Sequence, residues 1–263
     1  MPHLDQHPPG DFCWIELGTN NQPDAKRFYQ TLFGWTANDI PVGPDEIYSM
    51  FQLEGRDVAA AYTLRPQQQA QGVPPHWLLY ISVVNADETA GRATGLGGQV
   101  LAPPFDVFDI GRMAVLKDPT GAVFAIWQPL KHQGTGIAGS NGALCWADLL
   151  TLDRGRASAF YSALFGWTIS TAPNDPSGYL HIANGEQFIG GMPDIAQMQP
   201  DAPSAWLLYI ATDDCDASVR KAEELGGSLC LPAMDIENVG RFAIVGDPQG
   251  ANFALFQWQP QPK

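Results

Sequence analysis

The chain has 263 residues, of which 45% are apolar and 16% are charged, and its net charge is −14. This length favours two domains, each large enough to bury a core, and the composition excludes both a disordered chain and a membrane bundle. The negative field repels phosphate and anionic lipid, so neither nucleic acid nor a membrane is expected as a partner.

The cysteines and the N-terminus bear on the compartment. Four cysteines over this length do not indicate a disulfide framework, and no C-x-x-C pair suggests a zinc site. The first ten residues, MPHLDQHPPG, lack the basic start and apolar stretch of a signal peptide. No run of apolar residues approaches the roughly 18 of a membrane-spanning helix. We therefore expect a cytoplasmic protein, monomeric or homodimeric.

The first predicted unit begins with a strand of alternating pattern at Phe12. A helix follows, which Asn21 or Gln22 can cap and Gly34 closes, and apolar side chains line one of its faces. That apolar face predicts that the helix packs on a sheet. Short strands complete the unit.

The second predicted unit starts again with a strand, at His76. Its helix, from about Asp87, is weaker because Gly91 and Gly95 lie inside it. The turn D-P-T-G at residues 118–121 then joins two short strands, since it has Pro and Gly where a type I turn favours them.

The rest of the chain repeats both units. Residues 12–36 align without a gap with residues 144–168, at 12 identities in 25 positions. Residues 76–129 align equally well with residues 205–258, at 22 identities in 54. Such a repeat decides the architecture, and it predicts a βαβββ unit four times over.

The predicted fold is α+β, with two similar domains at residues 11–130 and 141–260 and a linker at residues 131–140. The linker region contains G-T-G-I-A-G, which formally matches the dinucleotide fingerprint G-x-G-x-x-G. That motif needs a helix immediately after it, whereas a strand over residues 143–149 is predicted here. A flexible linker is the expectation.

The helix ending F-Y-x-x-L-F-G-W, the L-G-G after the second helix and the turn D-P-x-G-x-x-F occur in both copies. Together they resemble the vicinal oxygen chelate superfamily, which includes glyoxalase I, bleomycin-resistance proteins and extradiol dioxygenases. Within it the chain is similar, over residues 11–260, to tandem glyoxalase-like proteins often labelled hydroxylases. The resemblance implies that each domain curls a mixed sheet into a cup with helices on its outer face.

The resemblance also implies where a metal would bind, because metal enzymes of the superfamily place His or Glu on the cup side of the first and last strands. The corresponding side chains here are Trp14, Leu78 and Ala125 in the first copy, and Trp146, Leu207 and Ala254 in the second. None of these can ligate a divalent cation. We therefore expect no metal and no other cofactor.

A carboxylate stands beside a tryptophan in each copy. Strand alternation places Trp14 and Glu16 on the cup face of the first copy, and Trp146 and Asp148 on that of the second. Such a carboxylate could anchor an apolar ligand or act as a general base with a raised pKa. Alternatively, it faces solvent or pairs with an arginine, Arg112 or Arg241.

The same alternation assigns Cys13 and Cys145 to the helix face, where buried and inert thiols are expected. Further cup-facing candidates for ligand binding are aromatic or lie near the rim: Tyr80 and Tyr209, Trp127 and Phe256, and His76. Such aromatic residues are more often part of a core than of a ligand wall, and a solvated or structural role is favoured for His76.

Three functions stay open. The chain could be a metal-free enzyme acting on a small oxygenated or aromatic molecule, a binding protein that sequesters a small toxic compound, or a metal-dependent lyase or dioxygenase whose ligands escape the alignment. We expect the first copy to be the more active. Glu16 is longer than Asp148, and it has His76 nearby where the second copy has Ala205.

Overall fold

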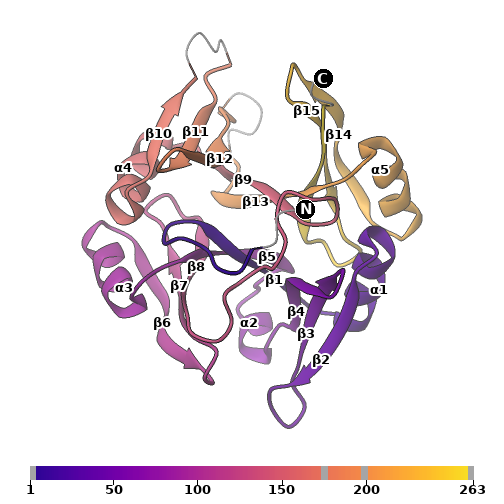
Figure 1. The fold of residues 1–263 in the computed structure, drawn as a ribbon, viewed down its shortest axis with the longest axis horizontal. Helices are drawn as coiled ribbons and strands as arrows, with labels where there is room; N and C mark the ends of the chain where they lie inside the picture. Colours follow the sequence, from indigo (N-terminus) through magenta and orange to yellow (C-terminus); the bar gives the residue numbers. More distant parts are fainter. Residues whose placement is uncertain (1–3, 173–176, 197–200, 260–263) are drawn as a thin grey trace.

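The computed structural model describes residues 4–172, 177–196 and 201–259. Its strands form two eight-stranded mixed sheets with the same strand order (Figure 1). The first sheet has the order β2-β3-β4-β1-β5-β8-β7-β6 and the second β10-β11-β12-β9-β13-β16-β15-β14. Strands β8 and β16 therefore occupy equivalent places, as the internal alignment predicts.

The elements of the first half are β1 (Phe12–Thr19), α1 (Gln22–Phe33), β2 (Thr36–Pro41), β3 (Ile47–Leu53), β4 (Arg56–Thr63), α2 (Pro66–Ala70), β5 (His76–Ser82), α3 (Ala86–Gly95), β6 (Gln99–Val107), β7 (Gly111–Lys117) and β8 (Val123–Pro129). The elements of the second half are β9 (Leu144–Leu150), α4 (Arg154–Phe165), β10 (Thr168–Thr171), β11 (Leu180–Asn184), β12 (Gln187–Met192), β13 (Ala205–Ala211), α5 (Cys215–Glu224), β14 (Ser228–Ile236), β15 (Gly240–Gly246) and β16 (Asn252–Trp258). With the added helix α2, this is the predicted βαβββ unit four times.

Local sequence explains the helix ends. The side chain of Asn21 accepts a hydrogen bond from the Asp24 amide at the start of α1. Gly34 closes the same helix with a φ of 73°, a conformation that glycine adopts without the steric cost of a side chain. The weaker helix α3 also forms, and Asn85 caps it.

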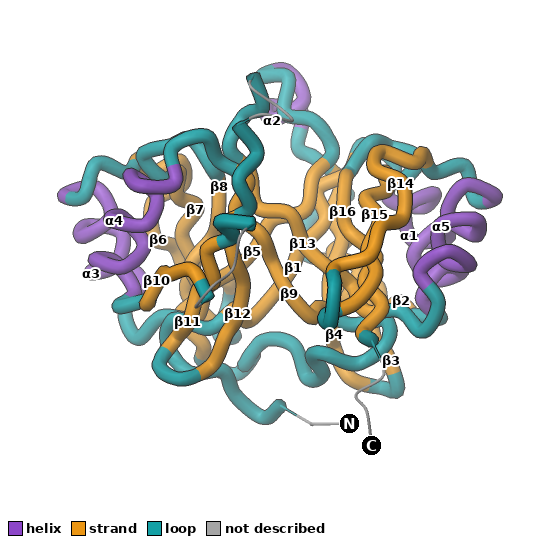
Figure 2. The backbone as a smooth tube through the Cα atoms, turned by 90° about the horizontal axis from the view of Figure 1, so that it is seen from above, coloured by secondary structure: helices purple, strands orange, loops and turns teal. Residues whose placement is uncertain are grey.

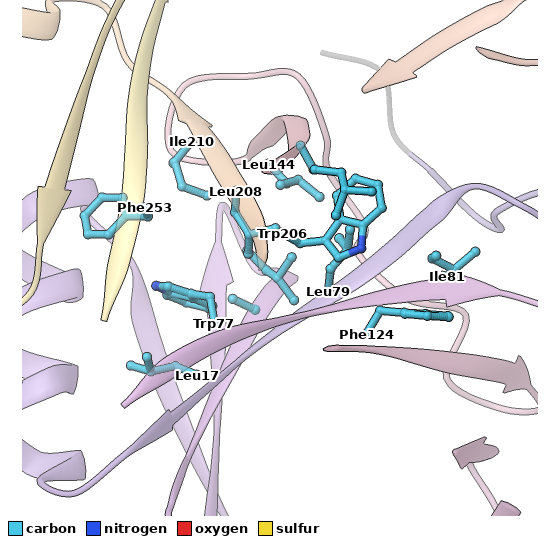
Figure 3. Packing of buried hydrophobic residues seen from close by; sticks show 14 of the residues in the cluster. Leu17, Trp77, Leu79, Ile81, Phe124, Leu144, Trp206, Leu208, Ile210 and Phe253 are labelled. Atoms are coloured by element: carbon cyan, nitrogen blue, oxygen red, sulfur yellow. The ribbon is translucent and has the colours of Figure 1, made fainter. Parts of the chain in front are cut away.

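Each sheet is built from two units adjacent in the chain, but the helices pair between the halves. Helix α1 contacts α5, and α3 contacts α4. These pairs lie at opposite ends of the molecule, on either side of the sheets (Figure 2). The strands β5 and β13 cross between them, and the apolar side chains of the two sheets form one continuous core there (Figure 3).

Two of the repeated motifs meet in this core. In α1, Tyr29 donates a hydrogen bond from its hydroxyl to Asp247 of the second-half turn at 3.0 Å, and it accepts one from Trp77. In the other half, Tyr161 of α4 accepts a hydrogen bond from Trp206 at 3.0 Å, as Tyr29 does from Trp77, and burial and the charge of Asp118 raise its pKa. The tyrosine of F-Y-x-x-L-F-G-W thus lies beside the aspartate of D-P-x-G of the other half in both places, and at Tyr29 it also donates a hydrogen bond to it.

The segment at residues 131–140 differs from the flexible linker that we expected. Its Thr135 and Gly136 amides donate to the carbonyls of Cys13 and Asp57, and the Ile137 side chain is fully buried. Gly134 has a φ of 109°, and a methyl group there would lie 2.3 Å from the Cys13 carbonyl oxygen. The glycine-rich composition therefore serves close packing on β1. The predicted domain limits themselves stay a prediction.

Candidate functional site

The face of each sheet opposite the helices carries a separate cluster of side chains, which we call the first cup and the second cup. The first cup brings together five of its predicted residues, Trp14, Leu78, Tyr80, Ala125 and Trp127. The second cup brings together Leu207, Tyr209, Ala254 and Phe256, with Trp146 packed against them.

Neighbouring strands place a carboxylate at the centre of each cup. Glu16 on β1 pairs with Ala60 on β4 and with Leu78 on β5. In the second cup, Asp148 pairs in the same way with Gly191 and with Leu207. The strands thus hold the two carboxylates at equivalent positions.

In the second cup the carboxylate is enclosed. Asp148 is 4% exposed. It accepts hydrogen bonds from Tyr179 Oη at 2.5 Å, Tyr209 Oη at 2.8 Å and Trp146 Nε1 at 3.0 Å. Burial raises its pKa, and the three hydrogen bonds oppose that rise because they stabilise the ionised form.

In the first cup the carboxylate is more accessible. Glu16 is partly buried and accepts a hydrogen bond from Tyr48 Oη at 2.8 Å. The Trp14 indole donates to Tyr48 Oη at 3.2 Å. Burial raises the pKa of Glu16, while hydrogen bonds from Tyr48 and Tyr80 and the positive charge of Arg65 lower it.

The difference between the cups follows from one methylene group and one methyl group. A methyl group at Gly191 would lie 2.0 Å from Tyr179 Oη, so only glycine lets this phenol come down to the short side chain of Asp148. In the first cup Ala60 carries that methyl group. There the longer Glu16 accepts its hydrogen bond from Tyr48 instead.

The arginine alternative is wrong for both carboxylates. Arg112 binds Asp87 and Asp106, and Arg241 binds Asp216 and Asp235. These pairs lie on the helix side of the sheets, because Asp87 and Asp216 belong to α3 and α5. Neither arginine therefore reaches into a cup, and Glu16 and Asp148 have other partners.

The predicted helix-face position of Cys13 and Cys145 is wrong, since both contact the cup-side clusters. The β1–β5 register shifts between Phe12 and Trp14, and the β9–β13 register shifts at the matching place. Such a bulge breaks strict alternation. Burial raises the pKa of both thiols, which favours their inert protonated form.

His76 lies away from the first-cup cluster, at the far end of the row that contains Glu16. It pairs with Gly18 on β1, and a methyl group at Gly18 would lie 3.1 Å from His76 Cε1 and 3.0 Å from Tyr62 Oη. Its Nδ1 is 2.8 Å from the Pro74 carbonyl oxygen. In the second cup Leu150 takes the place of Gly18.

Sequence reasoning missed four residues of the cups. Tyr48 and Tyr179 lie in the stretch where the two copies do not align without a gap, so no repeat signal marked them. His181 pairs with Gly191 beside Asp148, and its Nδ1 is buried without a hydrogen-bond partner. His132 comes from the connecting segment, and its ring lies 4.7 Å from that of Trp14.

The residues of the cups do not fit a divalent metal. The positions that the resemblance assigns to metal ligands carry indole, isobutyl and methyl side chains, which have no suitable donor atoms. Within residues 4–172, 177–196 and 201–259, no group of three His, Cys, Asp or Glu side chains is arranged to hold a metal ion. In the same residues, no helix is long and apolar enough to cross a membrane.

Comparison with known proteins defines the class. The family model of the glyoxalase/bleomycin resistance protein/dioxygenase superfamily matches residues 12–126, and a glyoxalase-like domain model matches residues 146–256. The chain therefore belongs to this superfamily, with two glyoxalase domains in tandem.

Among curated relatives, the Mycobacterium tuberculosis protein named "Putative glyoxylase CFP32" is 39% identical over 99% of this chain and 100% of its own length. The anthracycline biosynthesis protein DnrV of Streptomyces peucetius is 34% identical over 95% of this chain and 94% of its own.

Two solved structures share the fold. The Mn(II)-bound glyoxalase from Novosphingobium aromaticivorans superposes with a TM-score of 0.64 at 14% identity, over 95% of this chain and 82% of that one. The 2,3-dioxygenase LapB from Pseudomonas sp. KL28 also gives 0.64, at 10% identity, over 97% of this chain and 95% of that one. At these identities the likeness concerns the fold alone.

Proposed function

We propose that this protein binds a small oxygenated or aromatic molecule in its first cup without a metal ion, and that Glu16 is the polar anchor and proton-transfer group of that site. The observation that carries the proposal is the contrast between the two carboxylates. Asp148 is enclosed by three donors, whereas Glu16 is only partly buried and accepts a hydrogen bond from Tyr48.

The surroundings of Glu16 support an uncharged ligand. Trp14 and Trp127 supply flat apolar surfaces, and the hydroxyls of Tyr48, Tyr62 and Tyr80 are close enough to its carboxylate to be influenced by its charge. An anion would be repelled by the carboxylate and by the net charge of −14. Relatives named for anthracycline biosynthesis are in keeping with an oxygenated aromatic ligand.

The chemistry available at Glu16 is proton transfer. Desolvation brings the pKa of a carboxyl group toward the range in which it can both take up and release a proton near neutral pH. Tyr48 holds one carboxylate oxygen in place by its hydrogen bond, while burial raises the pKa of the phenol well above its ordinary value, so it stays a donor.

In the second cup, the donors to Asp148 occupy the positions that a ligand would use. We propose a structural role for this carboxylate, so that one molecule binds per chain. This distinguishes the two carboxylates that the sequence suggested as equivalent catalytic candidates.

The test uses 1-naphthol, a small uncharged aromatic with one hydroxyl group, and naphthalene as its matched control. We expect saturable binding of one 1-naphthol per chain, weakened about 5- to 10-fold by Glu16→Gln and unchanged by Asp148→Asn. Equal binding of 1-naphthol by the wild type and Glu16→Gln would contradict the proposed anchor.

Two further measurements separate the functions left open by the sequence. Elemental analysis should find less than one nickel, zinc, iron or manganese ion per chain, and a chelator should leave 1-naphthol binding intact. A stoichiometric metal ion whose removal abolishes binding would restore the metal-dependent alternative. Screening oxygenated aromatics for continuous turnover distinguishes an enzyme from a protein that only sequesters its ligand.

A further inference from the structure

The connecting segment crosses one end of the first cup and carries a histidine into it. We call residues 130–137 the strap. Leu130 and His132 donate their amides to the carbonyl of Ile110, and Thr135 and Gly136 donate theirs to the carbonyls of Cys13 and Asp57. The strap is therefore fastened to β7's leading turn on one side and to β1 and β4 on the other.

His132 is the side chain through which the strap contacts the cup wall. Its ring lies 4.7 Å from that of Trp14 and 6.0 Å from that of Trp127, edge-on to both. Its carbonyl accepts a hydrogen bond from the Trp127 indole at 2.9 Å. Both tryptophans of the first cup are thus held against the strap.

A second histidine fastens the strap from its outer side. His7 Nε2 lies 3.0 Å from the carbonyl oxygen of Thr135 and 3.3 Å from its hydroxyl. The amide of Leu4 donates to the carbonyl of Gly136. The N-terminal segment therefore covers the strap, and the strap covers the cup.

We propose that the strap is a pH-sensitive closure of the first cup, which opens when His132 and His7 take up protons. The closed strap has poor provision for a charged His132. Its side chain is 17% exposed, and its Nε2 is buried without a hydrogen-bond partner. Asp57 is the facing acid, but its Oδ2 lies 3.8 Å from His132 Nε2, beyond hydrogen-bond distance, and Gln52 holds its Oδ1.

The direction of the pH response follows from the burial of the two histidines. Burial and the neighbouring His7 lower the pKa of His132, and Asp57 raises it, while Trp14 and Trp127 contribute no charge. Burial also lowers the pKa of His7 and outweighs the hydrogen bond to the Thr135 carbonyl and the charge of Asp11, which raise it. Since an open strap would return the pKa of each histidine to its ordinary value, acid favours the open form.

Amide hydrogen exchange tests the strap without any ligand. Below an unperturbed histidine pKa of about 6.5, each pH unit raises the open population up to about 10-fold for each histidine. We expect the amides of Thr135 and Gly136 to lose protection between pH 8 and 5.5 by up to about 10-fold for each histidine, after correction for the intrinsic pH dependence of exchange. His132→Phe, which keeps a ring against the tryptophans, should remove the part of this loss that His132 contributes.

The second half of the chain supplies the control. After β16, the amide of Gln259 donates to the carbonyl of Val239 as Leu130 does to Ile110, but the residue that corresponds to His132 in the sequence is Gln261. The protection of the Gln259 amide should not change with pH. Equal losses at Gln259 and at the strap would indicate general acid unfolding, and either that result or an unchanged pH response in His132→Phe would overturn the proposal.

A second arm rests on the proposed function. The association rate of 1-naphthol with the wild type should rise on acidification in parallel with strap opening, and His132→Phe should flatten that rise. If 1-naphthol fails to bind at every pH while the exchange results hold, the proposed ligand site is wrong and the closure stands. If binding occurs but its rate ignores pH in both proteins, the strap does not control access.

Discussion

The two cups show how one fold can hold the same kind of carboxylate in two different states. Asp148 is shorter, lies opposite Gly191 and is enclosed by two phenols and an indole. Glu16 is longer, lies opposite Ala60 and accepts from Tyr48 while part of it stays exposed. A single methylene group, matched by a single methyl group on the neighbouring strand, separates a structural centre from an accessible one.

The coverings of the cups differ in the same direction. The first cup is closed at one end by the strap, which buries Trp14 to 4% exposure. The corresponding Trp146 is only partly buried, and in the sequence Gln261 stands where the first half has His132. An accessible polar centre behind a covering that can move is suited to a ligand site. An enclosed polar centre is suited to holding a sheet together.

The largest test of this comparison is to remove each carboxylate. Asp148→Ala leaves the hydroxyls of Tyr179 and Tyr209 and the indole of Trp146 without their acceptor in a buried place, so we expect a loss of about 3 kcal/mol in the free energy of unfolding. Glu16→Ala should lose less than about 1 kcal/mol. Urea unfolding of both variants gives the comparison, and equal losses would show that the two carboxylates contribute equally to stability.

The next test exchanges the residues opposite the carboxylates. Gly191→Ala forces Tyr179 away from Asp148, because the new methyl group would lie 2.0 Å from its hydroxyl oxygen. We expect a loss of about 2 kcal/mol in the free energy of unfolding, of the size found for overpacked cores. Ala60→Gly, the reverse change, should lower the free energy of unfolding by only about 0.5 to 1 kcal/mol, the cost of a glycine within a strand.

Much of this architecture could be predicted from the sequence because the second half of the sequence repeats the first. The repeat located all four βαβββ units, and the caps at Asn21 and Gly34 set the ends of α1. Glu16 and Asp148 could be placed on the cup face by alternation alone. The bulges at Cys13 and Cys145 could not, since a register shift depends on how two strands meet rather than on either sequence.

The partners of the carboxylates were beyond sequence reasoning for a similar reason. Tyr48 lies in β3 and Tyr179 immediately before β11, in a stretch whose spacing differs between the copies. The distance from Tyr179 to Asp148 depends on the missing side chain of Gly191. His132 lies in a segment whose glycines suggested flexibility. Only its packing on Cys13 and Asp57 shows that it belongs to the first cup.

A third test concerns a place where the two halves should behave alike. Tyr29→Phe removes the acceptor of the Trp77 indole, and Tyr161→Phe removes the acceptor of the Trp206 indole. Each should lower the free energy of unfolding by about 1 to 2 kcal/mol, since a buried indole N–H loses its partner in the core between the halves. Calorimetry of the two variants should give similar shifts in Tm. A large difference would mean that the asymmetry of the cups extends into the shared core.

The smallest expected effect is the pH dependence of stability that each carboxylate contributes. Burial raises the pKa of Asp148 and of Glu16, so each group binds its proton more strongly in the folded than in the unfolded chain. The contribution of such a group to stability is full below its unfolded pKa, about 4, and is lost as pH rises through the folded pKa. Comparing urea unfolding at pH 4 and pH 8, Asp148→Asn and Glu16→Gln should each lose less stability over this range than the wild type, by about 1 kcal/mol or less.

Asp148 is more deeply buried than Glu16 but is bound by more donors, so burial and hydrogen bonding oppose each other more strongly at Asp148. The size of the change in Asp148→Asn relative to that in Glu16→Gln shows whether burial or hydrogen bonding dominates. If the stability of the wild type rises more steeply with pH than that of both variants, the pKa values of Asp148 and Glu16 are not raised in the folded protein.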